Sequence, residues 1–246
     1  MKRIAWIMMT MAALTCGLSV NAMAQGNLIY FPYLENDGET STQLILNNLS
    51  GADANVSLIT FDEGGIPQSE NTVFVPAASQ NVVGPASLGF GYGWVLGVSD
   101  APGIVGNLRI SSADGTAQDM SEAVKPASVI LLPLLGQSFP AETEISVANA
   151  NPNTGRVTLT LYNRTGSIVA TRDSSLGPFA MYRGSLSSIF GANRDYSNAS
   201  HVIARSIPAN IVSPAVSIVG LEVVEDFARI PTDGVSQEYE DAVAFC

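Results

Sequence analysis

Side chains that could carry out catalysis or bind a metal ion are scarce in this sequence. The 246 residues include one histidine, His201, and two cysteines, Cys16 and Cys246. Zinc sites and histidine-based catalysis need several such side chains close together. No motif supplies partners for His201, so we expect a structural histidine. The sequence therefore predicts a protein that is not an enzyme and that has no metal ion or cofactor.

One serine has neighbours that are faintly similar to a catalytic motif. Ser99 stands in the segment Gly97-Val98-Ser99-Asp100-Ala101. A nucleophile elbow places its serine at a turn from a strand to a helix. Here Ala101-Pro102-Gly103 predicts a turn between two strands, so we assign no catalytic residue.

Acidic residues outnumber basic ones, 22 to 11, which gives a formal net charge of -11. A surface of this sign repels phosphate backbones, so a nucleic-acid partner is excluded. Carboxylates gather at residues 35–39 and 62–63, but neither group has EF-hand spacing, and calcium needs about six to eight oxygen ligands. We expect solvated loops at both places, with calcium binding as the alternative.

Three aromatic residues could bind a ligand. Tyr30, Tyr92 and Trp94, together with Phe31 and Tyr33, could line a platform on which sugar rings stack. The alternative interpretation makes Trp94 a core residue and lets the tyrosines cover strand ends, since these side chains combine an apolar body with a polar tip.

The first 24 residues have the organisation of a secretory signal peptide. Two basic residues precede an uncharged run over residues 4–20, and Ala22-Met23-Ala24 fits an A-x-A cleavage site before Gln25. We expect a mature chain without a transmembrane segment that is secreted, periplasmic or at the cell surface. The alternatives are a lipoprotein signal at Cys16 and a retained anchor, although the run is marginal for the roughly 20 residues of a spanning helix.

Cleavage before Gln25 would leave Cys246 as the only thiol. In an oxidising compartment a lone cysteine can pair with another chain, so Cys246 is a candidate for an intermolecular disulfide. The alternative is an inert thiol, because no neighbour would lower its pKa. Residues 226–246 predict a loosely ordered acidic tail, with partner docking as the alternative.

The sequence also contains an internal repeat. At an offset of 101 residues, positions 32–66 match positions 133–167 without a gap, and further along the offset becomes 107. The change places an insertion of about six residues within 190–198, which is typical of a surface loop. The identical pairs include Pro32 with Pro133, Leu34 with Leu135, Thr42 with Thr143, Asn48 with Asn149, Leu58 with Leu159 and, at the second offset, Ser99 with Ser206 and Ile104 with Ile211.

Within each copy the hydrophobic pattern has a period of two. Residues 55–61 and 156–162 alternate polar with apolar side chains and are rich in β-branched types, which predicts strands with one solvent-facing side. The segments 62–65 and 163–166 have the composition of hairpin turns. Only residues 186–190 could form a short helix.

We therefore predict an all-β protein with two tandem β-sandwich domains, related by internal duplication, after the signal peptide. The predicted domains cover residues 27–122 and 126–225. Residues 111–119 are small and polar, and we expect a linker or long loop there. Leu58 and Leu159 are expected core residues of the two sandwiches.

A set of strand and turn motifs marks the first copy. They are Tyr30-Phe31-Pro32, Thr42 to Asn48, Val56 to Phe61, Asp62 to Gly65, Gly93-Trp94-Val95 and Ile104-Val105-Gly106. Together they resemble the Ig-like β-sandwich repeat modules of secreted and cell-surface bacterial proteins, over most of the mature chain. The second copy departs at His201, which aligns with Trp94. It departs again at Ser213, which aligns with Gly106. The resemblance implies a structural or adhesive module and transfers no catalytic residue.

The leading prediction is a non-enzymatic structural, adhesive or assembly module at the cell surface or in the periplasm. Its partner would be a protein or another cell-surface molecule, a second copy of the chain included, contacted through loops and sheet edges. The alternative is a carbohydrate or small-ligand binding module that uses the aromatic residues of the first copy.

Overall fold

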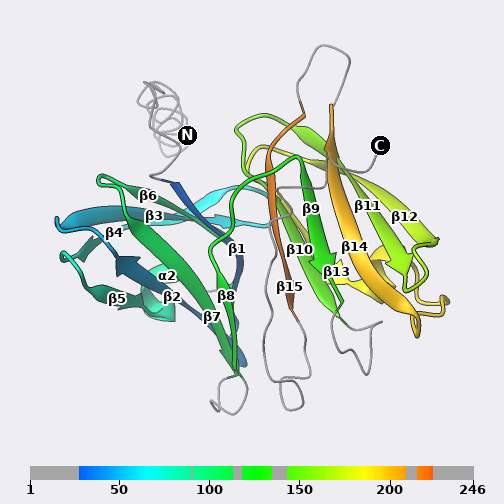
Figure 1. Ribbon diagram of the computed structural model, residues 1–246, viewed down its shortest axis with the longest axis horizontal. Coiled ribbons are helices and arrows are strands. Elements are labelled where there is room, and N and C mark those ends of the chain that lie inside the picture. Colours follow the sequence, from blue (N-terminus) through cyan, green and yellow to red (C-terminus); the bar gives the residue numbers. More distant parts are fainter. Residues whose placement is uncertain (1–27, 90, 113–117, 135–142, 209–214, 224–246) are drawn as a thin grey trace, which may run out of the picture.

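The structure, a computed structural model, describes residues 28–89, 91–112, 118–134, 143–208 and 215–223. In this part the chain is mostly β-strand with two one-turn helices, which confirms the all-β prediction (Figure 1). Neither helix is long and apolar enough to cross a membrane, as judged over the described residues. The predicted signal peptide, the acidic tail and Cys246 lie outside them.

The strands of the first half form one sheet that folds over on itself. Its order is β4-β3-β6-β1-β2-β7-β8, with β5 paired to β2. β1 pairs with β6 along most of its length but with β2 only at Asn36 and Ser41, so the sheet turns there into a second layer. The elements are β1 (Leu28–Asn36), β2 (Thr40–Asn48), β3 (Ala54–Asp62), β4 (Pro67–Val75), β5 (Gln80–Val83), α2 (Pro85–Leu88), β6 (Gly91–Ser99), β7 (Ile104–Ser112) and β8 (Gln118–Glu122).

The strands of the second half form two sheets. One has the order β12-β11-β14-β9 and the other the order β13-β10-β15. The helix expected at residues 186–190 is confirmed as α3, and the side chain of its N-cap Ser185 accepts a hydrogen bond from the Ser188 amide. The elements are β9 (Val129–Pro133), β10 (Glu144–Asn149), β11 (Gly155–Asn163), β12 (Ile168–Leu176), β13 (Met181–Ser185), α3 (Leu186–Phe190), β14 (Ala199–Ile207) and β15 (Ile218–Val223).

Each half has an apolar core between facing layers, and the first cluster also includes Leu221 and Val223 from β15 of the second half. Leu58 on β3 lies in the first cluster with Leu44 and Leu108, and Leu159 on β11 lies in the second with Val202. Both leucines are only 1% exposed. The alternating patterns of strands such as β2 and β11 therefore place one side inward, as expected for a sandwich-like arrangement.

The strand registers of the halves correspond, with one correction to the sequence alignment. Gly106 on β7 lies opposite Leu46, and Gly220 on β15 lies opposite Val147, the residue 101 positions after Leu46. Gly220 and not Ser213 is therefore the structural counterpart of Gly106. Both positions need glycine, because a Cβ atom would lie 2.5 Å from the Phe31 ring at Gly106 and 2.5 Å from Ile130 Cδ1 at Gly220.

The expected linker or long loop at residues 111–119 is wrong at its two ends. Ser111 and Ser112 end β7, and residues 118–119 begin β8, which pairs with β7 in an antiparallel hairpin. Hydrogen bonds between β7 and β8 pair the backbone groups at both ends of this small, polar segment. The side chains alone do not indicate this pairing. Residues 113–117 lie outside the described residues.

Candidate functional site: the aromatic joint between the halves

Three aromatic side chains stand next to one another on the outer side of the first half. Trp94 on β6 lies opposite Phe61 on β3, and Tyr30 comes from β1 on the other side of β6. The ring centroids of Phe61 and Trp94 are 5.0 Å apart, and those of Tyr30 and Trp94 are 6.5 Å apart. The planes differ by 19° and 11°, so the rings form a continuous stack.

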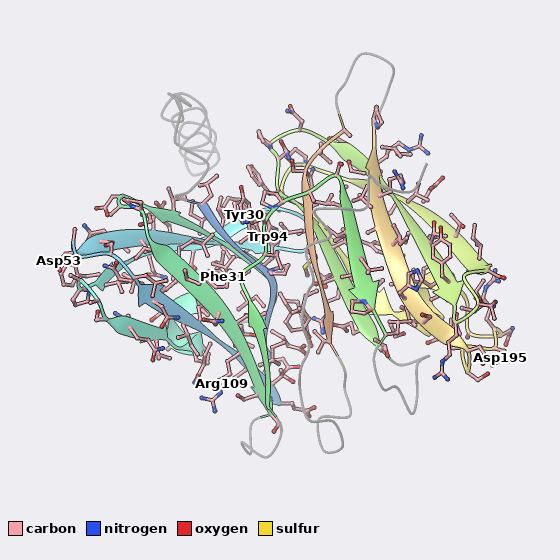
Figure 2. All side chains as sticks on the ribbon, in the orientation of Figure 1. Tyr30, Phe31, Asp53, Trp94, Arg109 and Asp195 are labelled. Carbon is pink, nitrogen blue, oxygen red and sulfur yellow. The ribbon has the colours of Figure 1, made fainter. Side chains whose placement is uncertain are left out.

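The second half covers this stack. Phe179, in the loop between β12 and β13, stacks on Phe61 with ring centroids 4.9 Å apart, and its main-chain carbonyl accepts a 2.7 Å hydrogen bond from Trp94 Nε1. Figure 2 shows Tyr30 and Trp94 on the side of the first half that faces the second. We call this contact the joint; its buried apolar members are Tyr30, Phe61, Trp94, Ala148, Met181 and Val219, with Phe179 partly buried against them.

The three predicted ligand-binding residues differ in their exposure to solvent. Trp94 has no exposed surface and Tyr30 is 8% exposed, whereas Tyr92 is 42% exposed. Burial raises the pKa of Tyr30. An open stacking platform made of all three is therefore not present, because the second half occupies the face that a sugar would need. Trp94 is a core residue, as the alternative proposed, but of the joint and not of the sandwich interior.

An arginine of the second half joins acidic and aromatic groups of the first. Arg183 on β13 is ion-paired with Glu35 at 2.9 Å and with Glu144, and its guanidinium donates a 3.1 Å hydrogen bond to the Tyr33 hydroxyl. It also lies 4.3 Å from the ring centroid of Tyr92, in cation–π geometry. The side chain of Arg183 is only 11% exposed, so these contacts are shielded from solvent.

The pKa values in this cluster follow from burial and from the two carboxylates. Burial lowers the pKa of Arg183, but the hydrogen bond from Arg183 to Glu144 and the surrounding negative charge outweigh it, and the pKa lies above the ordinary value. Burial, and then the charge of Glu144, raise the pKa of Tyr33. Arg183 therefore stays charged and Tyr33 stays neutral over the physiological range.

Main-chain groups complete the joint. The Met181 amide donates a 2.9 Å hydrogen bond to the Glu63 carbonyl, and the Ser146 hydroxyl donates a 2.8 Å bond to the Pro32 carbonyl. Gly65 has a φ of 81°, and a Cβ atom there would lie 2.1 Å from the Pro178 carbonyl oxygen. The backbones of the two halves are thus in direct contact at these residues.

Two carboxylates of the predicted solvated acidic loops hold turns, but the prediction is wrong for Glu35, which lies in β1 and is shielded in its ion pair with Arg183. The Asp37 carboxylate accepts hydrogen bonds from the amides of Thr40 and Glu39, and these bonds lower the pKa of Asp37. The Asp62 carboxylate accepts a hydrogen bond from the Ile66 amide. Among the residues that the structure describes, no group of three or more His, Cys, Asp and Glu side chains could hold a metal ion.

Ser99 and His201 lie in different halves. The Ser99 hydroxyl donates to the Ala101 carbonyl at 2.7 Å. His201 on β14 stacks on Tyr162 with ring centroids 4.9 Å apart, and burial lowers the pKa of His201. The two side chains are thus not parts of one site.

The sequence analysis missed Phe179 and Arg183. Their counterparts 101 residues earlier are Ala78 and Val82, in a region where the two copies otherwise form the same elements. A residue that becomes large or charged in one copy alone is a signal that this copy makes an additional contact.

Comparisons with known proteins do not name a family. No family model matches the chain. No curated protein matches it either. Among solved structures, Thermotoga maritima 1070 is 14% identical, covers 42% of this chain and 96% of its own, and has a TM-score of 0.35.

Two larger proteins match more of the chain. A putative beta-galactosidase from Bacteroides fragilis is 12% identical with a TM-score of 0.25, and covers 82% of this chain and 34% of its own. A glycosyl hydrolase family 2 member from Bacteroides cellulosilyticus DSM 14838 is 12% identical with a TM-score of 0.20, and covers 84% and 28%. The chain thus spans about a third of the length of these two proteins.

Proposed function

We propose that the protein is an exported, non-enzymatic structural module in which two β-sandwich domains, related by internal duplication, form one rigid unit. The observation that carries the proposal is the joint. It consists of a four-ring stack, a shielded arginine between two carboxylates and main-chain hydrogen bonds. Such a contact fixes the relative position of two modules, which suits a spacer, adhesin or assembly component better than a catalyst.

The domain boundaries of this proposal are residues 27–122 and 126–225, and residues 1–24 act as the signal peptide. The corresponding registers of β3 with β6 and of β11 with β14 support a duplication, since Phe61 faces Trp94 as Tyr162 faces His201. The protein works at the cell surface, in the periplasm or outside the cell. Its partners are proteins or other surface molecules, contacted through exposed sheet faces and edges.

The test combines location, processing and ligand response. Cell fractionation with intact-mass measurement is expected to find the chain outside the cytoplasm, beginning at Gln25. Glycans added to this exported chain are expected to leave the fluorescence of Trp94 unchanged, because the residue is buried in the joint. An unprocessed cytoplasmic chain would overturn the proposal.

A saturable glycan response would instead favour the carbohydrate-binding alternative. Of the three predicted ligand-binding residues, Tyr92 alone is accessible. The response would therefore have to disappear in Tyr92→Ala. A Phe74→Ala variant, which removes another exposed aromatic ring, serves as the control.

A further inference from the structure

The face that the joint covers in the first half has a counterpart in the second that stays partly exposed, as judged over the described residues. Register places Tyr162 and His201 where Phe61 and Trp94 lie, with rings 4.9 Å apart and planes within 7°. In the joint, Phe179 stacks on the free side of Phe61. No aromatic ring of the described residues stacks on the free side of Tyr162.

We call this counterpart the end face. It lies on the outer side of β9, β11 and β14, where residues that face one another across the strands share a side. Every member is partly exposed, and apolar side chains surround the two rings. Its members are Val129, Leu131, Thr160, Tyr162, His201 and Ile203.

The surface that covers the joint also has a counterpart, which we call the loop end of the first half. Ala78 corresponds to Phe179 and has the same uncommon left-handed backbone, with φ of 51° against 55°. Val105 lies opposite Asn47 as Val219 lies opposite Ala148. Val105 is 40% exposed, and Leu49, which corresponds to Ala150, is 73% exposed. Exposed apolar side chains thus lie at the loop end, next to the polar Asn47 and Gln80, which correspond to Ala148 and Met181.

Charge distinguishes the two surfaces. At the loop end the Asp53 carboxylate accepts a 2.9 Å hydrogen bond from the Ala77 amide, so this carboxylate lies near Ala78. Figure 2 shows Asp53 at the end of the molecule far from the second half. On β14, Arg205 is exposed two residues after Ile203. Opposite charges favour contact of the loop end with the end face and disfavour contact of either surface with its own copy.

We propose that copies of this chain associate head to tail, with the loop end of one copy covering the end face of the next. The contact brings together, between chains, the strands that correspond to those of the joint within one chain, with Ala78 and Val82 in the places of Phe179 and Arg183. It is heterologous, so each added copy leaves one free surface of each kind, and assembly stays open unless the rotation between copies closes a ring. The inference rests on the proposed structural function and names its partner as a second copy.

The test is sedimentation velocity of the exported chain over a concentration series, in about 0.15 M salt, where charges more than about 8 Å apart are screened. Reductant is present, so a Cys246 disulfide cannot contribute. The weight-average mass of the wild type is expected to more than double with concentration and to reach no plateau. Leu49→Arg blocks the loop end and Ile203→Glu blocks the end face, and each variant alone is expected to stay monomeric.

An equal mixture of the two variants distinguishes this geometry from others. The intact loop end of Ile203→Glu can still cover the intact end face of Leu49→Arg, so the mixture is expected to form a dimer and nothing larger. Arg205→Glu replaces Ile203→Glu if that variant does not fold, since Arg205 is exposed. Glu39→Arg, an exposed charge reversal in the turn between β1 and β2, is the control and is expected to assemble like the wild type.

Three results would overturn the proposal: a wild type that stays monomeric, a wild type that stops at a dimer, or a mixture that forms no dimer. None of them bears on processing or location. A chain that is exported and monomeric would therefore end the head-to-tail inference and leave the structural function standing.

Discussion

The indole nitrogen of Trp94 donates its hydrogen bond to the main-chain carbonyl of Phe179, 85 positions further along the chain, over 2.7 Å. The bond joins the two halves at the centre of the ring stack. Leaving a buried indole N–H without a hydrogen-bond partner costs free energy. The bond to Phe179 therefore stabilises the docked arrangement of the two halves.

Gly65→Ala tests the closeness of the halves, with Gly166→Ala as its matched control. Both glycines have a φ near 80°, at 81° and 79°, but a Cβ atom meets the Pro178 carbonyl at Gly65 and nothing within 4 Å at Gly166. Both variants should lose about 1 to 2 kcal/mol of unfolding free energy from backbone strain. Gly65→Ala should lose clearly more in urea unfolding; equal losses would mean that the turn does not contact residue 178.

Arg183→Met tests the ion pairs of the joint. Removing one partner of a shielded pair leaves Glu35 and Glu144 without a counter-charge, and should cost about 3 to 5 kcal/mol of unfolding free energy. Arg156→Met is the control, because Arg156 is 47% exposed and pairs with Asp173 at 3.6 Å. Its cost should be below about 1 kcal/mol. Similar losses for the two variants in thermal unfolding would argue against a clamping role of Arg183.

Leu58→Ala and Leu159→Ala test whether each half has its own core. Both leucines are 1% exposed and belong to different apolar clusters. Each substitution should cost about 2 to 5 kcal/mol of unfolding free energy, from lost transfer energy and the cavity left behind. Changes within about 0.5 kcal/mol at both positions, which are typical of surface sites, would exclude the two-core arrangement.

His201 should make stability depend on pH. Burial lowers its pKa in the folded protein, so the unfolded chain binds the proton more readily. Stability should therefore be constant well above the unfolded value of about 6.5 and fall as the pH drops through the folded pKa. Urea midpoints between pH 8 and pH 5 measure the effect. His201→Phe keeps a ring against Tyr162 and should flatten the dependence in this range; an unchanged profile would assign it to other groups.

The alternating pattern predicted much of each half, for a physical reason. In β11, polar Thr158 and Thr160 separate inward Val157 and Leu159, so the core side is evident from the sequence. The same rule fails in β3, where Ile59 and Phe61 are apolar on the outer side. The other half buries Phe61, and Ile59 is partly buried against the same cluster, a contact that local periodicity cannot encode.

The joint could be predicted only from differences between the copies. Tyr162 and His201 stand where the first copy has Phe61 and Trp94. The more apolar pair indicates that this face of the first copy is less exposed to solvent than its counterpart in the second. The turn at Asp62 could be predicted, because Asp62 and Asn163 hold equivalent turns and each accepts a hydrogen bond from the amide four residues later, whereas the burial of Glu35 in its ion pair with Arg183 could not. The register of β15 could not be predicted, because the segment between β14 and β15 is longer than the segment between β6 and β7.

Collisional quenching of Trp94 fluorescence by acrylamide tests the joint most directly, because the proposed cleavage before Gln25 would remove the other tryptophan, Trp6. In the exported wild type Trp94 should be strongly protected and emit at short wavelength. Phe179→Ala opens one side of the stack and should raise the quenching constant, shift the emission to longer wavelength and cost about 1 to 3 kcal/mol of unfolding free energy, whereas Phe74→Ala should change none of these. Free quenching of Trp94 in the folded wild type would contradict the docked arrangement of the two halves.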